Sequence, residues 1–256
     1  MNRIEHLFQK KRNILNIYLT AGFPQLDDTV EIVKELERAS VDMVEIGMPF
    51  SDPLADGPVI QHSSSVAIQN GIRLELIFSQ IEEIRKTSPI PIVLMGYFNQ
   101  LMQYGEEAFF ERAVRCGVDG LIIPDLPVEI YREKYQETIE NLGLDMIFLI
   151  SPQTEEKRIQ LLDEASRGFL YVVSSASTTG KTADLQQKER AYFERISQMS
   201  LKNPLLIGFG ISNKESYETA CRYASGAIIG SAFIRALEES TDRKKNIHQF
   251  VKTIRS

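Results

Sequence analysis

The chain has 256 residues, of which 43% are hydrophobic and 25% charged, a balance typical of globular proteins. Its formal charge of −6 and scattered basic residues argue against a protein that binds a nucleic-acid backbone. No apolar run approaches the roughly 18 residues needed to cross a membrane, and the N-terminus carries no signal-peptide apolar core. We therefore expect a soluble cytoplasmic protein with no nucleic-acid or membrane partner.

Apolar runs of strand length recur along the whole chain. They are nearly continuous rather than alternating, as expected of parallel strands that are covered on both faces. In chain order, the predicted strands are residues 14–19, 43–47, 90–95, 118–123, 145–150, 168–173, 204–209 and 226–230.

Amphipathic helical patterns fill the gaps between these runs. The helix after the first strand has Asp27 or Asp28 as a candidate N-cap, and the helix after the fifth strand has Thr154. Gly117 is a natural stop for the helix that precedes the fourth strand. A further amphipathic segment precedes the first strand and predicts an extra N-terminal helix.

Eight alternations of strand and helix, without a break in composition, predict an α/β fold in one domain over residues 1–256: a (β/α)8 TIM barrel. Two small domains would also fit the length. A doubly wound open sheet is the structural rival, but it usually carries a Gly-rich first turn, which the sequence lacks.

Two acidic residues stand where a barrel places its chemistry. Active sites of this fold lie on the loops at the carboxyl ends of the strands. Glu45 falls inside the apolar run 43–47, and Asp56 follows in a proline-rich loop. Ionised side chains are seldom buried without a partner, so we expect Glu45 to point into the mouth of the barrel. Asp52 is harder to place, because its surroundings also read as a turn.

Glycine-rich ends of the last strands indicate a phosphate site. Backbone N–H groups approach a ligand closely at glycines, and a helix N-terminus adds a favourable dipole. Loops after strands seven and eight are the usual phosphate position in this fold. The candidate residues are Gly208, Phe209 and Gly210 after the seventh strand, Gly230 and Ser231 after the eighth, and Thr179 and Gly180 after the sixth.

The strand ends exclude several reaction types. A Schiff-base aldolase needs a lysine there, and none of the predicted strands carries one. The three histidines do not converge on a metal site, and the two cysteines have neither a strand-end position nor metal-binding spacing. Carboxylate and tyrosine chemistry remains, with the candidates Glu45, Asp56, Asp125 and Tyr171.

The motif VEIGMPFSDPLADGPVIQ closely resembles the signature of the tryptophan synthase α subunit family. YLTAGFP, PDLP, GFGIS and GSA match that family in the same order and cover essentially the whole chain. The resemblance implies a lyase of tryptophan biosynthesis that cleaves indole-3-glycerol phosphate to indole and glyceraldehyde 3-phosphate by a retro-aldol step.

The resemblance also implies roles for individual residues. Glu45 matches the family's acid and base, and Asp56 matches the carboxylate that faces the indole N–H. Tyr171 resembles a tyrosine close to the substrate, and Tyr18 stands where the family has an aromatic residue against the indole. The loop after the sixth strand departs from the family pattern Ser-x-x-Gly-Val-Thr-Gly, because Ser177 replaces the glycine and Thr178 the valine. In the family this loop closes over the substrate and touches the partner, so the resemblance implies that the departure bears on both functions.

By resemblance, the chain needs no cofactor or metal of its own. It would form an α2β2 heterotetramer with a β subunit that carries pyridoxal phosphate (PLP) and condenses indole with serine. A stand-alone indole-releasing lyase and a barrel that only binds and activates a β subunit remain alternatives. Another phosphate-binding barrel, such as a sugar-phosphate epimerase or isomerase, would be expected to show metal ligands or a first-strand cysteine or aspartate, and NIYLTAG offers neither.

Overall fold

A computed structural model describes residues 2–53, 56–174, 183–208, 210–239 and 242–256. The strands of this part form one sheet in the order β5-β4-β3-β2-β1-β9-β8-β7-β6, and every pair in it is parallel. The strands are β1 (Ile14–Thr20), β2 (Met43–Gly47), β3 (Ile92–Met95), β4 (Gly120–Ile122), β5 (Asp145–Ile147), β6 (Leu149–Ile150), β7 (Leu170–Val173), β8 (Leu205–Gly208) and β9 (Gly226–Ile229).

The two ends of this strand order, β5 and β6, are consecutive in the chain, so the sheet closes into a barrel at Phe148. The predicted strand 145–150 is interrupted at Phe148, so that β5 pairs with β4 while β6 pairs with β7. The Phe148 N–H donates to Ser166 Oγ at 3.2 Å, and the Phe148 carbonyl accepts from the Tyr171 N–H at 3.0 Å. The two halves together form the fifth of eight barrel strands, and the predicted TIM barrel is confirmed.

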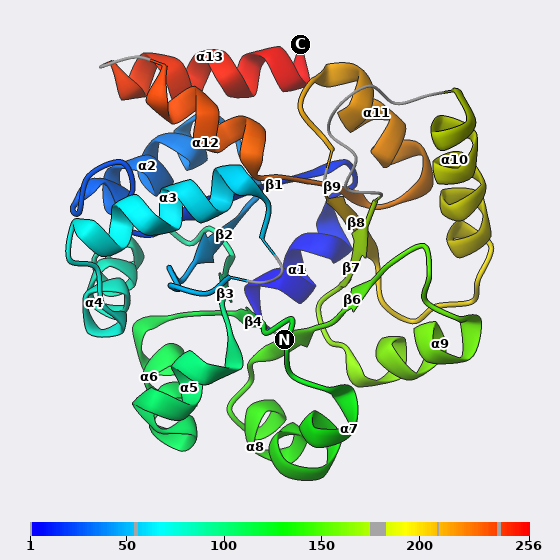
Figure 1. Ribbon diagram of the computed structural model, residues 1–256, viewed down its shortest axis with the longest axis horizontal. Coiled ribbons are helices and arrows are strands. Elements are labelled where there is room, and N and C mark those ends of the chain that lie inside the picture. Colours follow the sequence, from blue (N-terminus) through cyan, green and yellow to red (C-terminus); the bar gives the residue numbers. More distant parts are fainter. Residues whose placement is uncertain (1, 54–55, 175–182, 209, 240–241) are drawn as a thin grey trace.

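Helices surround the strands, except for α1, which lies across the middle of the view (Figure 1). They are α1 (Arg3–Lys10), α2 (Asp28–Arg38), α3 (Pro58–Gln69), α4 (Leu74–Arg85), α5 (Phe98–Tyr104), α6 (Glu106–Cys116), α7 (Val128–Ile130), the π-helical turn η1 (Tyr131–Tyr135), α8 (Gln136–Asn141), α9 (Glu156–Ala165), α10 (Ala183–Ser197), α11 (Lys214–Tyr223), α12 (Ser231–Glu238) and α13 (Arg243–Arg255). None of the helices in the described ranges is long and apolar enough to span a bilayer.

One predicted helix cap is confirmed in its position and another was wrong. Asp27 is the N-cap residue of α2, although its side chain makes no capping hydrogen bond. Thr154 is not the N-cap of α9; its hydroxyl instead accepts from the Ser151 N–H at 3.0 Å and closes the preceding turn. The stop at Gly117 is confirmed, because this glycine ends α6 in the left-handed region, with φ at +98°.

The predicted N-terminal helix closes the bottom of the barrel. Ile4 of α1 is fully buried and belongs to one apolar cluster with interior residues of eight strands, among them Ile14, Met43 and Ile228. Cβ atoms added at Gly120 and Gly168 would come within 3.0 and 3.2 Å of the Ile4 side chain. Small residues at the strand starts therefore make room for the apolar face of α1.

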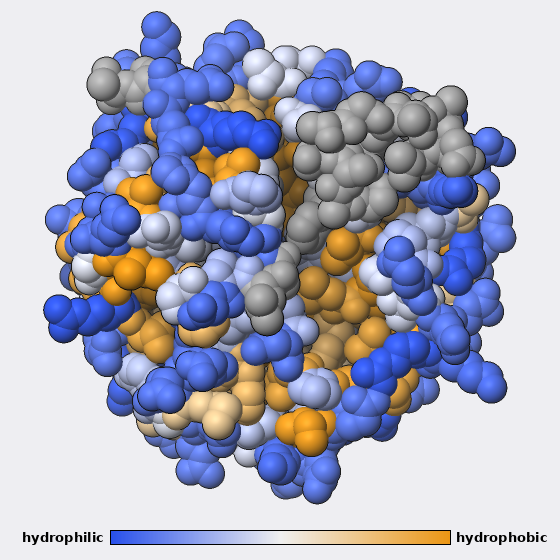
Figure 2. Space-filling model, in the orientation of Figure 1, coloured by the Kyte–Doolittle hydropathy of each residue, from blue (hydrophilic) through white to orange (hydrophobic). Residues whose placement is uncertain are grey.

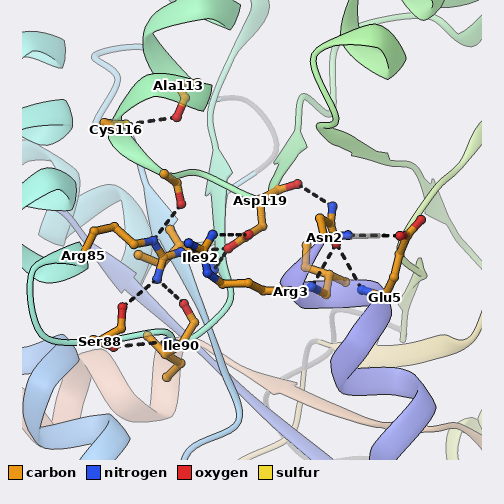
Figure 3. A network of polar contacts seen from close by, with 12 residues as sticks. Asn2, Arg3, Glu5, Arg85, Ser88, Ile90, Ile92, Ala113, Cys116 and Asp119 are labelled. Carbon is orange, nitrogen blue, oxygen red and sulfur yellow. Dashed lines mark hydrogen bonds and ion pairs between the residues drawn. The ribbon is translucent and has the colours of Figure 1, made fainter.

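A polar network fastens the same end of the barrel (Figure 3). The carboxylate of Asp119 lies at the start of β4 and is 2% exposed. It accepts from Arg3 Nη1 and Arg85 Nη2, both at 2.8 Å, and from the Ile92 N–H at 2.9 Å. The guanidinium of Arg85 also donates from Nε to the Gly117 carbonyl. One aspartate thus ties together α1, α4 and β3.

Candidate active site

Glu45 lies on β2 with its side chain inside the barrel and is 1% exposed. The parallel register places Tyr18 of β1 and Val93 of β3 on either side of it. Burial raises the pKa of its carboxyl group to about 8, a hydrogen bond from Asn16 lowers it, and the charge of Asp56 raises it. The carboxyl group therefore holds its proton near neutral pH.

Asp56 is a half-buried carboxylate just before the N-terminus of α3, where Gly57 is the N-cap and Pro58 the first residue. Burial raises its pKa to about 6, and a hydrogen bond from Tyr97 lowers it. The helix is anchored to β1, because Ser63 Oγ lies 2.7 Å from Thr20 Oγ1. The anchored helix fixes the position from which Asp56 reaches the barrel mouth.

The predicted tyrosines are buried among the ends of the strands. Tyr18 and Tyr171 are 8% and 5% exposed, and each leans diagonally across to the end of the neighbouring strand. A Cβ atom at Gly47 would overlap the Tyr18 phenol oxygen, and one at Gly208 would overlap that of Tyr171. Only glycine at these strand ends leaves room for the rings.

Electrostatic coupling shows that these side chains form one group. Burial is the main cause that raises the pKa of the Tyr18 and Tyr171 phenols, and the charges of Glu45 and Asp56 raise both further. The structure thus brings together four residues that are separated by up to 153 positions in the chain, Tyr18 at one end and Tyr171 at the other. In Figure 2, apolar residues reach the surface toward the middle of the face seen in Figure 1, and hydrophilic residues dominate its rim.

The predicted phosphate residues lie where two strands end. Gly208 is the last residue of β8, and Gly210 has φ at +73°, which favours glycine. Gly230 follows β9 as the N-cap of α12, and Ser231 is the first residue of that helix. Thr179, Gly180 and Phe209, and the departing residues Ser177 and Thr178, lie outside the described residues.

Tyr97 is a site residue that the sequence analysis did not single out. It follows β3, is 8% exposed, and donates the hydrogen bond that lowers the pKa of Asp56. Its ring stacks on Phe50 with centroids 5.1 Å apart. Its place directly after a predicted strand was the signal that could have found it, since active-site residues of this fold follow the strands.

Comparisons with known proteins agree with this geometry. The family profile described as Tryptophan synthase alpha chain matches residues 4–255. The tryptophan synthase alpha chain of Flavobacterium johnsoniae is 52% identical over 255 residues and covers 100% of both chains. That of Bacteroides thetaiotaomicron is 50% identical over 248 residues, 96% of this chain and 97% of the other. The chain belongs to the tryptophan synthase alpha chain family.

Solved structures agree. The crystal structure of tryptophan synthase subunit alpha from Legionella pneumophila has a TM-score of 0.88 to this chain at 34% identity, covering 100% of this chain and 97% of that one. A chain in a structure titled tryptophan synthase from M. tuberculosis, aminoacrylate-bound form, has a TM-score of 0.87 at 28% identity, with 99% of this chain and 98% of that one covered. The family resemblance and the predicted fold are both confirmed.

Membership of this family establishes the reaction. The chain is a carbon–carbon lyase of tryptophan biosynthesis that cleaves indole-3-glycerol phosphate to indole and glyceraldehyde 3-phosphate. Its partner is the β subunit, to which the indole passes.

Asp125, another candidate acid, connects two loops at the carboxyl ends of the strands. Its exposed side chain accepts from the Phe98 N–H at 2.8 Å and so bonds the first turn of α5 to the loop after β4. Nearby, Gln100 Nε2 donates to the Pro49 carbonyl at 3.0 Å and links α5 to the proline-rich loop that follows β2. The structure thus gives Asp125 a contact that supports the segment carrying Tyr97.

Replacing Asp125 with alanine is expected to lower the free energy of unfolding by about 1 kcal/mol, the usual effect of losing a side-chain acceptor at a helix start. Urea denaturation measures the change. The substrate KM is expected to rise, because Tyr97 and Asp56 are less firmly placed. A variant with unchanged stability and unchanged KM would show that the Phe98 bond contributes nothing.

The remaining polar residues considered in the sequence analysis, among them the histidines and cysteines, are not brought together in the described residues. No group of three or more His, Cys, Asp or Glu side chains among the described residues is arranged to hold a metal ion. His62 is exposed on α3 and lies 3.2 Å from Glu238, and Cys116 is buried on α6. Asp52 is exposed and accepts from Ser51 Oγ at 2.5 Å.

Proposed function

We propose that Glu45 is the acid and base of the lyase reaction and that Asp56 stabilises the positive charge that develops on the indole ring. The observation that carries this proposal is the difference between two carboxyl groups of one pocket. At neutral pH the Glu45 carboxyl, with its pKa raised to about 8, is protonated, whereas Asp56, with its pKa raised to about 6, is ionised. Such a separation assigns one group as proton donor and the other as fixed negative charge.

The reaction begins with a proton transfer to carbon. Glu45 donates its proton to C3 of the indole, the ring π electrons form the new C–H bond, and the ring nitrogen becomes an iminium. The Asp56 carboxylate facing that N–H stabilises the charge where it develops.

Cleavage then returns the proton. The Glu45 carboxylate removes the proton of the side-chain hydroxyl, and the O–H electrons form the aldehyde C=O bond. The electrons of the broken C–C bond go back to the ring and cancel the iminium charge, releasing indole and glyceraldehyde 3-phosphate. Glu45 ends the cycle protonated, so no proton is gained or lost overall.

The remaining candidates bind the two ends of the substrate. Tyr18 and Tyr171, buried beside Glu45, supply aromatic surface for the indole ring. Backbone N–H groups at Gly208, Phe209 and Gly210 and at the start of α12, with Gly230 and Ser231, are assigned to the phosphate, and Thr179 and Gly180 are assigned as further substrate contacts. A helix N-terminus binds an anion without a basic side chain.

The proposal extends to the assembly. The chain acts as one TIM-barrel domain, in the cytoplasm, as the α subunit of an α2β2 complex. It uses no cofactor of its own, and PLP belongs to the β subunit. Physical reasoning supports direct transfer, since free indole is apolar enough to be lost through membranes.

A pH profile tests the assignment of the two carboxyl groups. With the wild-type chain in complex with a β subunit, kcat/KM for indole release is expected to be bell-shaped. Activity falls below pH about 6, where Asp56 is protonated, and above pH about 8, where Glu45 has lost the proton it must donate. A flat profile between pH 5 and 9 would contradict the assignment.

Replacing Tyr97 with phenylalanine is expected to move only the acidic side of this profile. The lost hydrogen bond had lowered the pKa of Asp56, so the acidic limb moves to higher pH while the alkaline limb stays. Tyr104→Phe, on the outer side of α5, is the matched control, because its ring packs against Phe78 and Phe109 away from the carboxyl groups. If the acidic limb moved equally in both variants, the proposed effect of Tyr97 on the pKa of Asp56 would be contradicted.

A further inference from the structure

Asn16 is a buried amide in an otherwise apolar part of the barrel wall. It lies on β1, two residues before Tyr18, and is 0% exposed. The register places Met43 of β2 and Ile228 of β9 beside it, and both belong to the apolar barrel interior. Burying an amide among apolar side chains costs free energy unless hydrogen bonds compensate. Packing alone therefore does not explain why this position is an asparagine.

Among the described residues, the side-chain amide makes one hydrogen bond, and that bond reaches Glu45. Asn16 Nδ2 donates to Glu45 Oε2 at 3.4 Å, diagonally across β1 and β2. The same diagonal offset brings the Tyr18 ring to Gly47 and the Tyr171 ring to Gly208. It follows from the strand stagger of the barrel. The contact is thus set by the backbone register rather than by one flexible side chain.

The other end of the amide has no partner. Asn16 Oδ1 is buried and accepts no hydrogen bond from the described residues. Buried polar atoms of native proteins are nearly always paired, and an exception calls for an explanation. Rotation about the terminal torsion of asparagine exchanges the oxygen and the NH2 group with little change of shape.

We propose that Asn16 is a positioning residue that bonds the Glu45 carboxyl group in both of its protonation states. The Nδ2 group donates to the carboxylate, and after rotation Oδ1 accepts from the protonated acid. This rests on the proposed function of Glu45 as acid and base, since only a group that alternates between the two forms in each turnover needs a partner that both donates and accepts. An apolar residue of similar shape would leave Glu45 unsupported in both forms.

The other groups that face Glu45 do not provide a partner that can both donate a hydrogen bond to it and accept one from it. Tyr18 of β1 and Tyr171 of β7 are buried phenols coupled to the Glu45 charge, and Asp56 adds a like charge from the loop before α3. Asp56 raises the pKa of Glu45, whereas the bond from Asn16 lowers it. The bond to the carboxylate is the stronger of the two that Asn16 makes because its acceptor is charged, so loss of the amide leaves the influences that raise the pKa of Glu45 unopposed.

The test compares Asn16→Leu with Met43→Leu in the complex with the β subunit. Asn16→Leu is expected to lower kcat for indole release by about ten- to a hundred-fold, as misplacement of a reacting group does. The alkaline limb of its kcat/KM profile moves to higher pH, while KM changes little. Met43→Leu, the matched change opposite Asn16 on β2, leaves both kcat and the limb at wild-type values.

A second readout does not depend on activity. Carboxyl-¹³C NMR of the chain labelled at glutamate, with the Glu45 signal assigned from its loss in Glu45→Gln, is expected to show a higher Glu45 pKa in Asn16→Leu. Asn16→Ala serves the same purpose if the leucine variant does not fold. Asn16→Gln keeps an amide and is expected to place the limb closer to wild type.

The possible failures are distinguishable. If Glu45→Gln turns over like wild type, the proposed role of Glu45 is wrong. If Glu45→Gln is inactive but Asn16→Leu and Asn16→Ala leave the alkaline limb and the NMR titration of Glu45 unchanged, the role of Asn16 is overturned. A loss of thermal stability without a change in either titration would show a structural residue only.

Discussion

Replacing Glu45 with glutamine is expected to slow the release of indole from indole-3-glycerol phosphate by about a thousand-fold. Glutamine has nearly the same shape but neither donates a proton to C3 nor removes one from the hydroxyl. Substrate binding is expected to persist, since the phosphate and indole contacts lie on other strands. Steady-state kinetics with the β subunit, together with substrate binding by calorimetry, measure the two effects separately.

The fold of this variant is expected to be at least as stable as wild type at pH 7 and above. Glu45 has its pKa raised to about 8 in the folded chain, so the folded state binds more protons than the unfolded state between pH about 4.5 and 8. Stability therefore falls as pH rises through that range, and an uncharged glutamine escapes this loss. Thermal denaturation of wild type and Glu45→Gln at pH 6 and 9 measures this difference in stability.

Glu35→Gln is a matched control for the loss of a buried glutamate. Glu35 of α2 is 4% exposed and bonds His248 of α13 at 2.9 Å, on the outside of the barrel. Its replacement is expected to reduce stability while the folded fraction turns over at the wild-type rate. If both glutamine variants lost activity equally, a general structural effect would explain the loss, and the catalytic role of Glu45 would be contradicted.

Replacing Asp119 with alanine is expected to lower the free energy of unfolding by about 3–5 kcal/mol, because it removes one partner of a buried ion pair. The Arg85 side chain is 11% exposed, and its charge would lose the carboxylate that faces it at 2.8 Å. Burial already lowers the pKa of Arg85 to about 10, against the opposing influence of Asp119. Urea denaturation of the variant measures the effect.

Two further variants separate the contributions to this network. Arg3→Ala is expected to cost less, because the Arg3 side chain is 45% exposed and its ion pair with Asp119 is screened by solvent. The double variant Arg85→Met with Asp119→Ala is expected to be more stable than the sum of the single losses predicts. Additive losses would show that the two side chains act independently. Activity of the folded fraction is expected to persist throughout, since the network lies at the closed end of the barrel.

Sequence patterns predicted most of the fold. All eight strand segments were found, because strands covered on both faces leave continuous apolar runs. The break at Phe148 was missed, since residues 145–150 read as one run and the interruption comes from a Ser166 hydroxyl eighteen residues away. The Thr154 prediction failed for a similar reason, because the hydroxyl bonds a nearby turn instead of the helix.

The sequence by itself determined the eightfold alternation, the place of Glu45 in the second strand and of Asp56 in the loop after it, and the family signature. These are local properties, carried by side-chain period, glycine positions and residue type along a short stretch. Only the tertiary structure decided which partners meet them: Asn16 from β1, Tyr97 from beyond β3 and Tyr171 from β7. The physical reason is that register and stagger between strands, not spacing along the chain, set which side chains share the barrel interior, and the burial they produce there separates the pKa values of two ordinary carboxyl groups.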